Sequence, residues 1–67
     1  MKIEEVREIA KSFKGMVVSE WNDNEEGLHF IFLFNGYEML LQECEISNKK
    51  DVEEICEELV RYVEQDF

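Results

Sequence analysis

Apolar residues follow two different periods along the chain, and the change of period separates helical from extended segments. In residues 2–14 they recur at helical spacing with charged residues on the opposite side, and Gly15 is expected to end this helix. Residues 49–65 carry the clearest helical stripe, which Ser47 or Asn48 is expected to cap. The stripe consists of Val52, Ile55, Cys56, Leu59, Tyr62 and Val63.

Three extended segments separate the two helices. Residues 16–21 are β-branched and aromatic, which favours a strand, and residues 22–27 form an acidic turn. Asn35-Gly36 lies between two further apolar segments, 28–34 and 37–46. Because Asn and Gly tolerate the two positive φ angles of a type I′ turn, this pair predicts a tight hairpin.

The hairpin predicts which side chains share a face of the sheet. If Phe34 pairs with Tyr37, the side that carries Phe30, Phe32 and Phe34 becomes the core side. The opposite side is partly apolar, which is typical of an interface, although one helix on each face of the sheet would also explain it. The residues of this outer face are His29, Ile31, Leu33 and Leu40, with Val17 or Val18 and Trp21 as neighbours.

We therefore expect an α+β fold, a two-layer αβββα domain in which two helices pack on one face of a three-stranded antiparallel sheet. Residues 1–67 are expected to form a single domain, since a chain this short builds only one core. A small core without disulfides or a metal supplies limited stability, which makes dimerisation a reasonable expectation.

The charge of the chain restricts its partners. Seventeen acids against seven bases give a net charge of −10, which repels nucleic acid and anionic lipid and favours basic protein surfaces. The longest apolar run, residues 30–34, is far shorter than the ~20 residues that cross a bilayer. We expect a cytoplasmic protein without direct nucleic-acid or membrane binding, and its two cysteines are expected to be reduced, packed or half-packed thiols.

No residue pattern indicates catalysis, a metal site or a cofactor. His29 is the only histidine and is a diagonal neighbour of Cys44, but no third group is present to orient such a pair. The acidic segment 22–26 lacks the ligand spacing of a calcium-binding loop. The sequence therefore predicts a protein that is not an enzyme.

The final predicted helix carries an unusual number of like charges. Glutamates recur at successive turns with only Arg61 among them, although such pairs destabilise a helix. Five acids less one base over eleven steps of about 1.5 Å give roughly one net charge per 4 Å, near the ~3.4 Å spacing of phosphates along a DNA strand. The predicted partner-binding residues are Glu53, Glu54, Glu57, Glu58 and Glu64.

Two families share this order of elements. Double-stranded RNA-binding domains also place lysines where Lys49-Lys50 stand, but the acids that follow would repel phosphates. The combination of topology and acidity resembles small phage-encoded inhibitors, including anti-CRISPR proteins that act as DNA mimics. That resemblance implies a protein that occupies the nucleic-acid site of a basic host protein, in the host cytoplasm, through the glutamates named above.

Two hypotheses follow. The first is a non-enzymatic interaction protein that binds a basic, nucleic-acid-handling partner through its acidic helix. The alternative is a homodimeric structural or regulatory module that associates through the outer face of the sheet, where the acids only maintain solubility.

Overall fold

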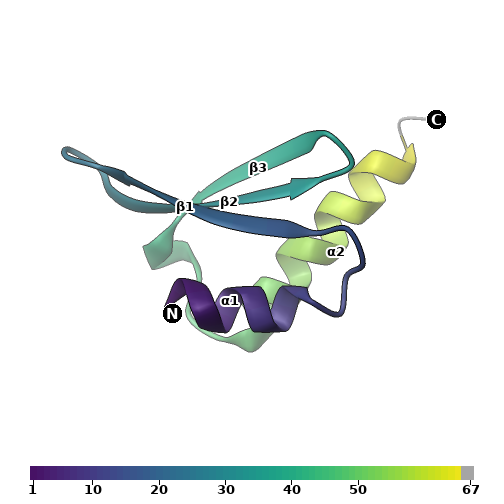
Figure 1. Cartoon of the computed structure of the whole chain (residues 1–67), viewed down its shortest axis with the longest axis horizontal. Coiled ribbons are helices and arrows are strands. Elements are labelled where there is room, and N and C mark those ends of the chain that lie inside the picture. Colours follow the sequence, from purple (N-terminus) through teal and green to yellow (C-terminus); the bar gives the residue numbers. More distant parts are fainter. Residues whose placement is uncertain (66–67) are drawn as a thin grey trace.

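The computed structural model describes residues 1–65 and has two helices on the same side of a three-stranded antiparallel sheet (Figure 1). This arrangement confirms the predicted α+β, two-layer αβββα architecture, and the alternative with one helix on each face of the sheet is wrong. In chain order the elements are α1 (Ile3–Ala10), β1 (Val17–Asp23), β2 (Gly27–Phe34), β3 (Tyr37–Gln42), the 3₁₀ turn η1 (Glu43–Glu45) and α2 (Lys49–Gln65).

The β2–β3 hairpin has the predicted turn and register. Asn35 and Gly36 have φ angles of 55° and 86°, the two positive values that a type I′ turn requires. Phe34 pairs with Tyr37, and the register continues to His29 opposite Gln42. On its other edge β2 pairs with β1, with Val17 opposite Leu33. Consequently β2 is the central strand, and β1 and β3 are the edges.

The core lies between the sheet and the two helices. Phe30 and Phe32 of β2 are fully buried, which confirms that the aromatic side of the sheet faces the helices. Val6 of α1 and Leu59 of α2 pack against them. Since side chains alternate along a strand, the same register turns Ile31 and Leu33 to the outer face.

Several predicted element bounds are wrong. The first strand runs from Val17 to Asp23 instead of residues 16–21, and β2 begins at Gly27, so the predicted turn of residues 22–27 is confined to residues 24–26. The first helix ends at Ala10 instead of residue 14, because Ser12 Oγ donates to the Ile9 carbonyl and Phe13 N donates to Ala10 in a tighter turn. Gly15 has φ 90° but lies four residues beyond the C-cap, so it serves a turn and not the helix end. The third strand stops at Gln42, where η1 begins.

The prediction of α2 as residues 49–65 is confirmed. Asn48 caps it, since its Oδ1 accepts the backbone N–H of Asp51 at 3.0 Å. Asp51 accepts in return from the backbone N–H of Ser47 at 2.8 Å. Tyr62 was predicted in the buried stripe but is exposed, and it contacts Tyr37 edge-on with ring centroids 5.8 Å apart. None of the helices in residues 1–65 is long and apolar enough to cross a membrane.

Candidate functional site

The five predicted partner-binding glutamates lie on α2 but do not form one uniform face. Glu54, Glu57, Glu58 and Glu64 are exposed, whereas Glu53 is half-buried. Glu53 lines a shallow hollow between α1 and α2 together with Glu8, Ile9, Ser12 and Lys49. Successive residues turn about 100° on a helix, so the glutamates fall into two rows. Glu53, Glu57 and Glu64 form the row nearer α1, and Glu54 and Glu58 form the other beside Arg61.

The glutamates of α2 form no ion pair with the basic side chains of residues 1–65. Across residues 1–65, the contacts within 4.0 Å between basic and acidic side chains join Lys11 to Glu8 and His29 to Glu26, and neither involves α2. Helical spacing would allow Glu53 and Glu54 to pair with Lys49 and Lys50, but these direct ion pairs are not formed. Instead Asp51, bonded to the backbone at Ser47, places a negative charge at the start of α2.

Most of the excess negative charge lies outside α2. The chain has no lysine or arginine between Lys14 and Lys49, a stretch that contains the three strands and η1. The β1–β2 turn and the C-terminal end of α2 lie at opposite ends of the molecule (Figure 1). The acidity is thus distributed over two regions. The acids of the stretch without bases are Glu20, Asp23, Glu25, Glu26, Glu38, Glu43 and Glu45.

The outer face of the sheet is the second candidate surface, and it contains most of the apolar residues that the sequence placed there. Leu33 and Leu40 are exposed, and Ile31 between them is half-buried. The register adds Val17 and Trp21 of β1 to this face, with exposed fractions of 55% and 48%. Val18, the other residue that the sequence left open here, is buried in the core.

His29 belongs to the outer face, but it is only 3% exposed. Its ring lies 5.3 Å from the ring of Trp21, its Nδ1 lies 3.2 Å from the Gly27 carbonyl, and its Nε2 lies 3.5 Å from Glu26 Oε2. These contacts hold the ring as part of the β1–β2 hairpin, so it is not presented to a partner. The structural role follows from the register, which places Trp21 directly opposite His29.

The two cysteines have different environments. Cys56 is buried in the core, and desolvation, with a smaller contribution from Glu57, raises the pKa of its thiol from 9.0 to about 11. Cys44 is exposed, which contradicts its prediction as a packed or half-packed thiol, and it lies in η1, which contains no buried residue. Its Sγ donates to Gln42 Oε1 at 3.5 Å, and no contact joins it to His29. Both are free thiols.

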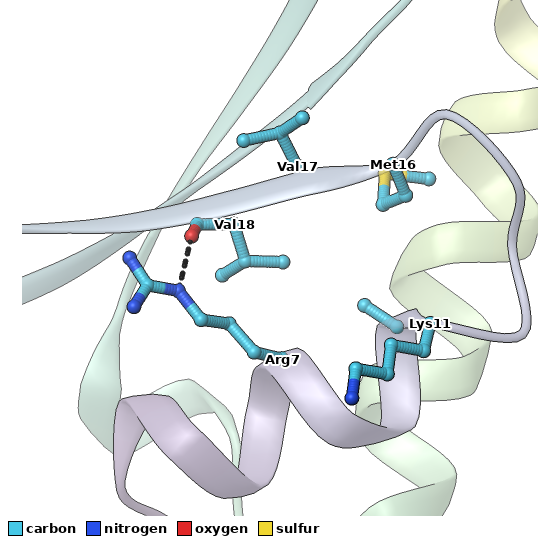
Figure 2. A pocket seen from close by; sticks show the side chains of 6 residues that line it. Arg7, Lys11, Met16, Val17 and Val18 are labelled. Atoms are coloured by element: carbon cyan, nitrogen blue, oxygen red, sulfur yellow. Dashed lines mark hydrogen bonds between the residues drawn. The ribbon is translucent and has the colours of Figure 1, made fainter.

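Sequence reasoning missed a groove beside the edge of β1. Arg7 and Lys11 of α1 line it together with Met16, Val17 and Val18 (Figure 2). Arg7 Nε donates to the Val18 carbonyl at 2.8 Å, so the side chain satisfies a backbone acceptor on the free edge of the sheet. A helix or side chain that covers the edge of a sheet discourages pairing with another strand. No sequence signal reveals this role, because Arg7 and Val18 are eleven residues apart.

Within residues 1–65 no group of three or more His, Cys, Asp or Glu side chains is arranged to hold a metal ion. Comparison with known proteins adds no relative, since no protein family, curated protein or solved structure matches the chain. The assignment of a function therefore rests on the two surfaces described above.

Proposed function

We propose that this domain is a non-enzymatic interaction protein that binds a basic protein surface through the glutamates of α2. The observation that carries the proposal is the set of exposed carboxylates on one helix without a basic partner in residues 1–65. Because these carboxylates form no internal ion pair, none has to be broken before they contact lysines or arginines of a partner. They also accelerate encounter with a surface of opposite sign.

The partner that suits this helix best is a protein whose basic surface normally holds nucleic-acid phosphates. Glu54, Glu57 and Glu58 occupy about one turn of α2, which concentrates three carboxylates within roughly 6 Å along the helix axis. Lysines and arginines arranged to contact successive phosphates accept carboxylates at similar spacing. In this proposal the domain competes with nucleic acid for its partner, as the phage-encoded inhibitors that it resembles do.

The test compares two triple variants that change the net charge equally. In the first, Glu54, Glu57 and Glu58 are replaced by lysine. In the matched control, the exposed residues Glu4, Glu20 and Glu25 are replaced instead. Each immobilised protein is incubated with host lysate, eluted in steps of salt, and the eluted proteins are identified. Circular dichroism establishes that every variant is folded.

The proposal expects a basic protein that wild type and the control variant retain at low salt and that the α2 variant loses. Its affinity should fall steeply as salt rises, and duplex DNA should displace it. A partner bound equally well by both triple variants would show that the total charge, and not α2, is responsible. Binding that is insensitive to salt would contradict the proposal directly.

A further inference from the structure

The outer face of the sheet carries exposed apolar side chains that neither helix covers. The register places its side chains in rows across the strands, with Val17 beside Leu33 in one row and Ser19, Ile31 and Leu40 in the next. Trp21 begins the third row. The two helices cover the opposite face, so this layer is separate from the α2 glutamates (Figure 1). Exposed apolar side chains grouped in this way are typical of a protein interface.

Carboxylates border this apolar surface at both ends. Glu38 of β3 is exposed in the first row, directly opposite Leu33. At the other end Glu26 is exposed beside His29, and Asp23 closes β1 opposite Gly27. The strands themselves contribute no lysine or arginine. Charge complementarity therefore favours an occupant that is apolar in its centre and basic at its ends.

A second copy of the chain suits this face less well. Three strands about 4.8 Å apart, with six or seven residues at about 3.4 Å each, cover roughly 300 Å². A stable interface between two domains buries about 800 Å² on each partner, so the face alone suits a single element of a partner better than a lasting homodimer. Two copies, each with a net charge of −10, would also bring like charges together.

We propose that the outer face binds an amphipathic helix of a partner protein that carries lysine or arginine at both ends of an apolar stripe. Helices are the elements that cover the faces of sheets in layered folds. The six residue steps from Gly27 to Leu33 span about 20 Å, which matches a helix of about 14 residues. The proposal goes beyond the α2 function, because it assigns an apolar docking surface on the other layer of the domain.

Trp21 provides the readout, since it is the only tryptophan and lies half exposed on this face. The probe is a synthetic helix of about 14 residues without tryptophan, with leucines at helical spacing and arginines at both ends. One control peptide has glutamates in place of the arginines, and a second has the same composition in scrambled order. Titration is followed by the emission of Trp21, and sedimentation measures the oligomeric state of the free protein.

We expect a saturable change in emission with the arginine peptide and binding roughly tenfold weaker with the glutamate peptide, as two exposed ion pairs allow. Leu40→Glu should weaken binding by at least about tenfold, because it places a charge in the apolar centre. Glu38→Lys alone, or combined with Glu26→Lys, should reduce the preference for the arginine peptide. The triple lysine variant of α2 should bind this probe as wild type does, which separates this proposal from the α2 function.

Three results would overturn the inference. The first is the absence of a saturable response, or an equal response to the scrambled peptide. The second is equal affinity for the arginine and glutamate peptides, which would remove the charge argument. The third is a concentration-dependent dimer that Leu40→Glu dissociates, which would identify a second copy as the occupant of the face.

Discussion

Replacing Leu59 by alanine, with Leu40→Ala as its matched control, measures how differently the two faces of the sheet are covered. Leu59 is 2% exposed in the core between α2 and the sheet, whereas Leu40 on the outer face is 54% exposed. The same three carbon atoms are removed in both variants. Any difference between the two losses of stability therefore comes from the surroundings of each leucine and not from the chemistry of the substitution.

The structure sets the expected magnitudes. Replacing a buried leucine by alanine lowers the free energy of unfolding by about 2–5 kcal/mol, because the cavity that is left adds to the lost transfer free energy of the side chain. Replacing a half-exposed leucine should lower the free energy of unfolding by less than about 1 kcal/mol. A domain of this size has a total stability of roughly 3–5 kcal/mol, so Leu59→Ala should be close to half unfolded at 25 °C.

Urea denaturation followed by circular dichroism at the helical band measures both variants against wild type. With an m-value of about 1 kcal/mol/M, the midpoint should fall by about 2 M or more for Leu59→Ala and by less than about 1 M for Leu40→Ala. Equal losses in the two variants would refute the reasoning. They would mean that the outer face is as buried in solution as the core, which requires self-association.

Two further predictions concern α2. Asn48→Ala should lower the free energy of unfolding by about 1 kcal/mol, since its Oδ1 accepts the backbone N–H of Asp51, whereas Ser47→Ala should change it little in the same urea titration. The pKa of Cys56, raised from 9.0 to about 11, means that the folded protein holds this proton more tightly than the unfolded chain. Its contribution to the free energy of unfolding is complete below pH 9 and is lost as the pH rises toward 11. The stability of Cys56→Ala should therefore fall less than that of wild type between pH 9 and 11. At pH 8 a thiol reagent should modify Cys44 rapidly and Cys56 only on unfolding; fast labelling of both would contradict the burial of Cys56.

Local chemistry accounts for the features that the sequence predicted well. The Asn35-Gly36 turn and the register of β2 with β3 follow from backbone preferences that act over a few residues. The bounds of α2 follow from its apolar period and its cap at Asn48. The early end of α1 was missed because Ser12 and Phe13 form short-range hydrogen bonds that compete with the helix, while the apolar period continues through them.

The candidate surfaces were predicted only in part. The alternation of β2 and β3 assigned Ile31, Leu33 and Leu40 to the outer face, but the choice of Val17 over Val18 required the pairing of β1. The burial of His29 depends on Trp21 from another strand and on Glu26 from the turn. The closure of the β1 edge by Arg7 likewise joins residues that are distant in the chain.

By itself the sequence determined the two-layer αβββα fold, the hairpin register, the bounds of α2 and the large negative charge, because periodicity, turn chemistry and composition act locally or over the whole chain. Only the tertiary structure decided that β1 adds Val17 and Trp21 to the outer face, that His29 is buried there, and that carboxylates border this apolar face. These properties depend on which distant segments lie side by side, and that is fixed by the packing of the core around Phe30 and Phe32.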